Sequence, residues 1–117
     1  MHVTRVTANL LVGDLDAATA FYRDVVGLST LEFDLGWVAR VTSPTTGAHL
    51  QLLTTDATAP EPPAITLHVT DVESAYAELQ DVGVEIVHPL TVETWGVHRF
   101  LFRAPDGTVV NVVEHHD

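Results

Sequence analysis

Polar side chains that could bind or act on a small molecule alternate with apolar side chains along several segments of the chain. One face of each segment is purely apolar and the other is mixed, which is the period of two expected of half-buried strands. Imidazole, amide and hydroxyl groups that converge on an apolar background are typical of a small-molecule site. We therefore predict a ligand-binding cleft lined by the mixed faces. Their side chains are Thr7, Asn9, His49, Gln51, Thr66, His68, Val109 and Asn111.

Arginines on two predicted strands add a second kind of binding group. Arg99 and Leu101 alternate with Phe100 and Phe102, so the first two face the cleft if the aromatic residues face a helix. Arg40 occupies the comparable place in the first half of the chain. A guanidinium is a rigid fork for a carboxylate, phosphate or enolic oxygen, and it also stacks on flat rings. The alternative for both arginines is an ion pair with one of the sixteen Asp and Glu residues.

The ligand predicted from these groups is a planar, oxygen-rich aromatic molecule. Trp37 and Trp95 would supply flat apolar walls for it, although ordinary packing in a core or loop is an equal interpretation of both. The formal net charge of −11 would favour a cationic ligand instead. Contacts inside the cleft should outweigh that long-range field, because salt screens exposed charges beyond about 8 Å.

The elements that must position these side chains occur twice in the sequence. Residues 11–18 are echoed by residues 68–75, and Asp14 and Asp71 are 57 positions apart. Each copy predicts a strand, an acidic helix cap and then a helix that ends at a glycine. Three further strands follow in each copy, so each half of the chain is predicted to be β-α-β-β-β.

Two tandem βαβββ modules predict an α+β fold, in which a curved mixed sheet forms the cleft and the helices lie outside. A chain of 117 residues is expected to be one domain. Module 1 covers about residues 1–55 and module 2 about residues 64–117, while residues 56–63 have the composition of a linker. The helices are predicted to end at Gly27 and Gly83. The later strands are predicted at 28–34, 36–43, 48–54, 84–88, 97–103 and 108–114.

The remaining histidines show no spacing that suggests a site. His88 precedes Pro89 and is predicted at the end of a strand. His115 and His116 are predicted in a solvated tail.

Several short motifs carry a family resemblance over essentially the whole chain. They are residues 12–18 with Phe21-Tyr22 and Gly27-Leu28, then Trp95-Gly96, residues 99–102 and the turn Pro105-Asp106-Gly107. Together they resemble the vicinal oxygen chelate (VOC) superfamily, and especially its glyoxalase/bleomycin-resistance branch. That superfamily contains glyoxalase I, extradiol dioxygenases, and fosfomycin- and bleomycin-resistance proteins. The resemblance specifies a fold more than an activity, because one fold hosts many functions.

The resemblance also implies where a metal would bind. Metal enzymes of this superfamily place ligands on the first and last strands of each module, and the matching positions here are Thr7, Gln51, Ala64 and Asn111. Ala64 has no donor atom, Thr7 and Asn111 are poor ligands, and a catalytic metal normally needs about three protein ligands. We therefore expect no metal and no other cofactor, which puts glyoxalase-type isomerisation and extradiol cleavage in doubt. A shifted site of His49, Gln51 and His68 is the alternative.

Composition limits the partners and the compartment. A chain with no lysine and a formal net charge of −11 is not expected to bind nucleic acid or anionic membranes. No secretory signal or membrane-length apolar segment is apparent, so we expect a cytoplasmic protein. The absence of cysteine excludes disulfides and thiolate chemistry. By resemblance, we expect a homodimer.

Three functions remain open at this stage. The first is a binding protein that sequesters an antibiotic or metabolite, as in antibiotic resistance. The second is a metal-independent enzyme acting on a planar, oxygen-rich metabolite, with His49 or His68 as acid/base and Arg99 or Asn111 stabilising an oxyanion. The third is an atypical metal-dependent lyase or dioxygenase. We favour the first, and whether the protein is an enzyme is left open.

Overall fold

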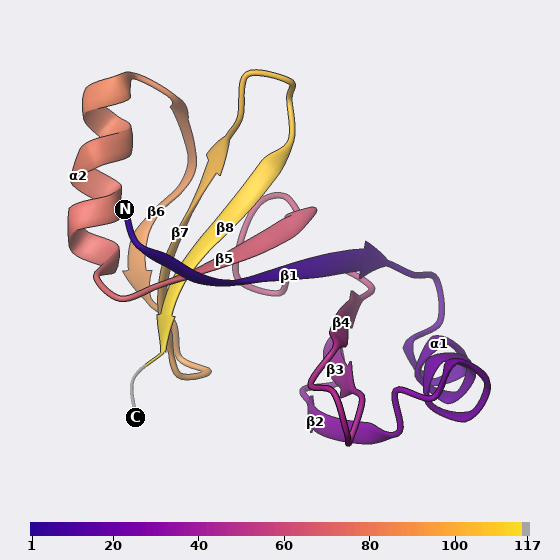
Figure 1. Ribbon diagram of the computed structural model, residues 1–117. Helices are drawn as coiled ribbons and strands as arrows, with labels where there is room; N and C mark the ends of the chain where they lie inside the picture. The colour runs from indigo at the N-terminus through magenta and orange to yellow at the C-terminus, as the bar shows by residue number, and fades with distance from the viewer. Residues whose placement is uncertain (116–117) are drawn as a thin grey trace. The chain divides into compact units, whose positions relative to one another are not determined.

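The computed structural model describes residues 1–115, and its elements follow one another as two βαβββ modules (Figure 1). This order confirms the predicted α+β fold class. No helix in that part of the chain combines the length and the apolar character needed to cross a membrane. The elements are β1 (Val3–Leu11), α1 (Leu15–Phe21), the π-helical turn η1 (Tyr22–Val26), β2 (Thr30–Asp34), β3 (Val38–Thr42), β4 (His49–Leu53), β5 (Ile65–Val69), α2 (Val72–Val82), β6 (Glu85–Val92), β7 (Val97–Arg103) and β8 (Val109–His115).

The contacts divide the described chain into two compact units. The N-terminal unit contains residues 8–57, and the C-terminal unit contains residues 1–7 together with residues 58–115. The hydrogen-bonded strand order is β2-β3-β4-β1 in the first and β1-β5-β8-β7-β6 in the second, so β1 contributes residues to both. Each unit is described below by itself, and the cleft expected between the two modules remains a prediction.

In the C-terminal unit, α2 covers one face of the sheet (Figure 1). The side chain of Asp71 caps the helix by accepting a hydrogen bond from the backbone N–H of Ser74 at 3.1 Å. Gly83 ends it in the left-handed conformation, with φ of 89°. Phe100 and Phe102 pack beneath the helix, as the strand alternation predicts. The buried core there consists of Val69, Val72, Ala75, Phe100, Phe102, Val110 and Val112.

The N-terminal unit repeats this plan with a shorter helix. β4 runs parallel to β1 and antiparallel to β3, and α1 packs on a core that includes Leu15, Val41 and Leu52. The single helix predicted up to Gly27 is α-helical only as far as Phe21. It then widens into the π-helical turn, in which the N–H groups of Gly27 and Leu28 both reach the carbonyl of Tyr22.

The sequence prediction placed the end of β6 too early. The strand continues to Val92, so His88 lies inside it and not at its end. Proline cannot donate a hydrogen bond to a ladder, which is why a strand end was predicted before Pro89. The structure accommodates Pro89 because β6 is an edge strand whose register with β7 shifts on both sides of His88. The predicted solvated tail, meaning His116 and the side chain of His115, lies outside the described residues.

We predict that the core beneath α2 contributes strongly to the stability of the fold. Val112 is 0% exposed, whereas Val82 on the helix is 69% exposed. Val112→Ala should lower the free energy of unfolding by roughly 2–3 kcal/mol, because two buried methyl groups are lost and a cavity remains. Val82→Ala, the matched control, should change it by less than about 0.5 kcal/mol. Urea denaturation of both variants checks this, and equal effects would contradict the assignment of the core.

Candidate functional site

The sheet of the C-terminal unit turns one face away from α2, and that face carries the polar candidates His68, Arg99 and Asn111. Cross-strand register aligns its residues in two rows, since paired residues on neighbouring strands point to the same side. We call this surface the polar face. Its first row is Thr66, Asn111, Leu101 and His88, and its second row is His68, Val113, Arg99 and Thr91.

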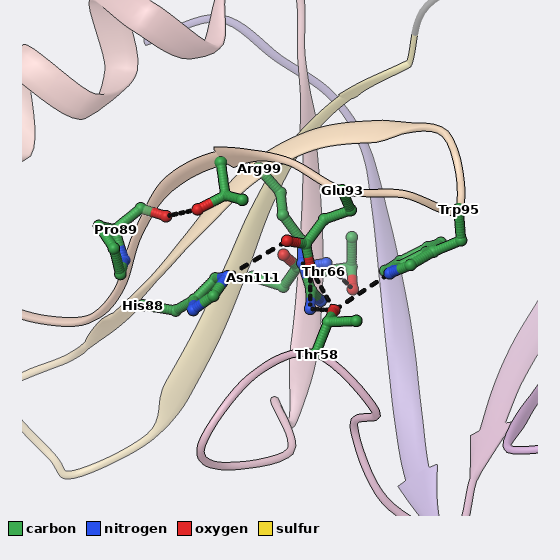
Figure 2. Close-up of polar contacts among 9 residues, drawn as sticks. Thr58, Thr66, His88, Pro89, Glu93, Trp95, Arg99 and Asn111 are labelled. Atoms are coloured by element: carbon green, nitrogen blue, oxygen red, sulfur yellow. Dashed lines mark hydrogen bonds and ion pairs between the residues drawn. The ribbon is translucent and has the colours of Figure 1, made fainter.

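Arg99 is the largest buried side chain on the polar face, and its guanidinium binds another protein side chain. It is 1% exposed, and its Nε and Nη2 donate to Oε2 of Glu93 at 3.1 and 2.9 Å (Figure 2). Nη2 also donates to the hydroxyl of Thr58 at 2.8 Å. The guanidinium carbon lies 5.0 Å from the centre of the Trp95 ring, within cation–π range. The ion pair that the sequence left as an alternative is therefore present.

Glu93 is the acceptor at the centre of this cluster. Besides Arg99, the hydroxyl of Thr58 donates to its Oε2, and Nε2 of His88 lies 3.4 Å from its Oε1 (Figure 2). Burial acts to raise the pKa of Glu93, but the hydrogen bond from Thr58 and the charge of Arg99 outweigh it, so the pKa lies below its usual value. Glu93 is consequently ionised at neutral pH and compensates the charge of Arg99.

Thr58 connects the linker segment to this cluster. Its hydroxyl donates to Glu93 and accepts from Arg99 and from the indole Nε1 of Trp95, the last at 3.1 Å. Trp95 is thus held by a hydrogen bond as well as by the ring contact with Arg99. The result is a closed network among charged, hydroxyl and aromatic groups of the C-terminal unit.

Asn111 lies beside this network and is incompletely satisfied. Its Nδ2 donates to the hydroxyl of Thr66 at 3.2 Å, and the residue is 5% exposed. Its Oδ1 is buried and accepts no hydrogen bond from any residue that the structure describes. A buried acceptor without a donor costs about 1–3 kcal/mol, so such an atom in a folded protein calls for an explanation.

His68 joins β5 to the first strand. Its Nε2 lies 3.0 Å from the hydroxyl of Thr7, and both side chains are buried. His68 also borders an open surface hollow of about 380 Å³, which Val69 and Glu114 from the helix side of the sheet line as well. The hollow is lined by Thr4, Arg5, His68, Val69, Thr70, Val113 and Glu114.

The other candidates belong to the N-terminal unit, where Arg40 is also paired. Its Nη2 donates to Oε1 of Gln51 at 2.9 Å, and its Nη1 lies 3.3 Å from Oε2 of Glu32. The guanidinium carbon is 5.0 Å from the Phe33 ring centre. Asn9 is buried and pairs with Gln51 in register. Trp37 and His49 are half-buried, and Nδ1 of His49 lies 3.2 Å from the carbonyl of Gly47.

The two units therefore divide the predicted site residues between them. The C-terminal unit brings Thr7, His68, Trp95, Arg99, Leu101 and Asn111 together, and the N-terminal unit holds Asn9, Trp37, Arg40, His49 and Gln51.

A comparison of the sequence with protein-family models decides the family. The model described as Glyoxalase/Bleomycin resistance protein/Dioxygenase superfamily matches residues 2–112. The chain belongs to this superfamily. No curated protein matches its sequence.

Solved structures of similar fold agree with this membership. A protein from Legionella pneumophila named NAD-dependent benzaldehyde dehydrogenase is 18% identical with a TM-score of 0.75, and the match covers 96% of this chain and 100% of that chain. A superfamily member from Vibrio splendidus is also 18% identical, with a TM-score of 0.67 and coverage of 94% and 97%. An uncharacterised protein from Methanosarcina mazei is 22% identical, with a TM-score of 0.71 and coverage of 99% and 95%. At such identities the likeness shows the fold alone.

The residues at the superfamily's metal positions do not fit a divalent transition metal. Thr7 contacts His68, Gln51 accepts from Arg40, Asn111 donates to Thr66, and Ala64 is exposed with only a methyl group. Neutral hydroxyl and amide groups that are already bonded to protein do not replace imidazole and carboxylate ligands. Within residues 1–115, no three His, Asp or Glu side chains gather as a metal site. The shifted His49, Gln51 and His68 site remains untested.

Sequence analysis missed Thr58, His88 and Glu93. Glu93 follows directly after β6, at the turn to β7, and its N–H donates to the carbonyl of Val97 at 2.7 Å. A predicted strand that continued beyond Pro89 would have placed Glu93 at this turn. Gly96 adopts a positive φ in the turn of that hairpin. The Trp95-Gly96 dipeptide was therefore the sequence signal that a turn, and with it Glu93, lies here.

We predict that Glu93→Gln destabilises the fold by about 3–5 kcal/mol at neutral pH, because it leaves the Arg99 charge buried without a counter-charge. Glu85→Gln, at the first residue of β6, is the control and should have little effect, since its partner Arg103 is partly exposed. Chemical denaturation measures the free energy of unfolding of both variants. An equal decrease in the two would show that the buried Arg99–Glu93 pair contributes no more than an exposed one.

The same pair predicts a pH dependence. Because folding lowers the pKa of Glu93, its contribution to stability is complete above the unfolded-state value of about 4.3 and is lost as the pH falls towards the folded-state value. Wild type and Glu93→Gln should therefore converge in stability on acidification. A difference in the free energy of unfolding between the two proteins that stays constant down to the pH of acid unfolding would contradict this.

We also expect protein purified without a histidine tag to retain no stoichiometric Zn, Fe, Mn or Ni after soaking and dialysis, because the donor set is wrong for these ions. Elemental analysis tests this. If wild type instead retained one equivalent of metal and the Gln51→Ala variant retained none, the shifted site would be supported.

Proposed function

We propose that this superfamily member binds a small antibiotic or metabolite on the polar face of the C-terminal unit and sequesters it without metal chemistry. The observation that carries the proposal is Oδ1 of Asn111, a buried acceptor for which the described residues offer no donor. A ligand that donates a hydrogen bond there would remove the cost of that atom and gain affinity from it.

The surroundings of Asn111 support a binding role. Polar groups that are few and convergent sit on an apolar background, with Leu101 and Val113 between them, as in most small-molecule sites. Sequestration requires a complementary surface but no reacting group. The polar face fits this requirement because its arginine, Arg99, is already paired with Glu93.

A metal-independent enzyme is the second candidate, and one contact favours it. Nε2 of His88 faces the buried carboxylate of Glu93, and a carboxylate that orients an imidazole is a common arrangement in acid/base catalysis. This differs from the sequence hypothesis, which assigned the acid/base role to His49 or His68.

The proposed function is tested by changing the one atom on which it depends. Asn111→Leu should alter the free energy of unfolding by less than about 1 kcal/mol, because removing the unmatched buried Oδ1 offsets the loss of the hydrogen bond to Thr66. The same change should weaken by at least tenfold the binding of any compound that quenches tryptophan fluorescence in a panel of planar aromatic amines, phenols and carboxylates.

Gln80→Leu is the control, a change of polar to apolar on an exposed position of α2. It should leave both stability and binding unchanged. Severe destabilisation by Asn111→Leu, or affinity that it does not alter, would show that Asn111 is structural. A panel without any response, in fluorescence or in amide NMR shifts, would count against binding altogether, while turnover lost only in His88→Ala would favour the enzyme.

A further inference from the structure

The two helical segments of the chain can be compared with each other, because they occupy the same place in the duplicated modules. Each begins at an aspartate cap, ends at a glycine and packs its inner face on a buried core. Their outer faces differ. Phe21 lies 57 positions before Glu78, which is the offset of the two caps, and Val25 and Asp81 each lie two residues before the final glycine. All four residues are exposed, so α2 carries charge where the first helix is apolar.

The outer face of α1 and η1 carries four exposed apolar side chains, Ala17, Phe21, Val25 and Val26, which we call the apolar stripe. The first three follow at intervals of four residues, about one helical turn, so they lie one above another along the helix. Phe21, Val25 and Val26 are 51%, 70% and 51% exposed. Single exposed apolar residues are ordinary on a protein surface, but a contiguous set of them marks an interaction site.

The π-helical turn contributes to the apolar stripe. Gly27 lies 13 positions after Asp14, whereas Gly83 lies 12 positions after Asp71, so the first helical segment contains one residue more. The wide turn accommodates the extra residue and leaves both valines of the stripe exposed. Single π-helical turns occur frequently at functional sites.

The border of the apolar stripe is acidic. Asp14, Asp16 and Asp24 are exposed on the same helical segment. Arg23 is the one basic residue between Asp14 and Gly27, and it is held by the two carboxylate oxygens of Asp24 at 2.9 and 3.2 Å. An acidic protein or an anionic membrane would be repelled by this border. Lysine or arginine side chains beside an apolar anchor would be attracted to it.

A second copy of this chain matches the apolar stripe poorly. It would bring the same acidic border and a formal net charge of −11. The side chains of the stripe expose on the order of 300 Å² in total, whereas a stable protein–protein interface buries about 800 Å² on each partner. A patch of this size is sufficient for the anchor residues of one helix.

We propose that the apolar stripe binds an amphipathic helix of another protein, one whose apolar face is bordered by lysine or arginine. From Ala17 to Val25 the stripe extends for about 12 Å along the helix axis, which matches two turns of a partner helix. The small side chain of Ala17 beside the ring of Phe21 gives the groove and the ridge that helix packing requires. The stripe belongs to the N-terminal unit alone, so this interaction is separate from ligand binding on the polar face.

Three peptides of about 14 residues, long enough to form a helix on binding, test the proposal. The first places leucine and lysine at amphipathic spacing, the second scrambles the same composition, and the third has glutamate in place of lysine. Fluorescence anisotropy in about 0.15 M salt measures their binding. The basic amphipathic peptide should bind at least tenfold more tightly than the other two. It should also shift the amide NMR signals of Ala17, Phe21 and Val25 while those on the outer face of α2 stay in place.

Variants separate the apolar contact from simple charge attraction. Phe21→Glu gives the first helix the residue of the second module, and it should weaken binding of the basic peptide at least tenfold although it adds a negative charge. Val92→Glu is the control, since it adds the same charge at a 67% exposed position outside the helices and should not weaken binding. Val25→Asp is a second variant of the stripe and should act like Phe21→Glu. Because these positions are exposed, all three variants should unfold in urea at nearly the wild-type midpoint.

The proposal is overturned if the scrambled peptide binds as tightly as the amphipathic one, because charge alone would then explain the binding. Absence of binding by the basic peptide, or binding that Val25→Asp and Phe21→Glu leave unchanged, would overturn it as well. Analytical ultracentrifugation tests the other occupant. A wild-type dimer that Phe21→Glu converts to a monomer would assign the apolar stripe to self-association and would also overturn the proposal.

Discussion

The ion pair between Arg99 and Glu93 is the interaction on which the polar face depends. Either charge alone would be very costly at this depth, and the pair is tolerated because hydrogen bonds from Thr58 and the guanidinium satisfy the carboxylate. Once formed, the pair orders its neighbours. It places Trp95 over the guanidinium, ties the linker to the sheet through Thr58, and aligns His88 against the second carboxylate oxygen.

Three of the residues matched to the superfamily's metal positions make hydrogen bonds within this chain. Where metal enzymes of the fold place imidazole and carboxylate ligands, Thr7, Gln51 and Asn111 make hydrogen bonds to protein side chains. The fold does not depend on these positions. Its apolar cores lie beneath α1 and α2 and contain none of the residues matched to metal ligands. Fold and chemistry are thus independent, as is usual for widely used folds.

Much of the fold follows from local pattern, and much of the candidate site does not. Strand alternation correctly assigned Phe100 and Phe102 to the helix side and left Arg99 and Leu101 on the opposite face. The same reasoning could not find the partner of Arg99, because Glu93 lies in a hairpin turn where side-chain direction has no period. It also ended the predicted strand at His88, before Pro89, because the shifted register that lets an edge strand include a proline depends on the neighbouring strand and not on the local sequence.

By itself, the sequence determined the duplicated βαβββ order, the cap residues, the helix-ending glycines and the acidic charge, because each of these depends on neighbours within a few positions. Only the tertiary structure decided which charges neutralise each other and which polar atoms stay without a donor. Those outcomes depend on cross-strand register, which brings His88, Leu101 and Asn111 into one row across three strands. Burial then makes each unmatched atom energetically significant, and that is why Asn111 rather than an arginine marks the candidate site.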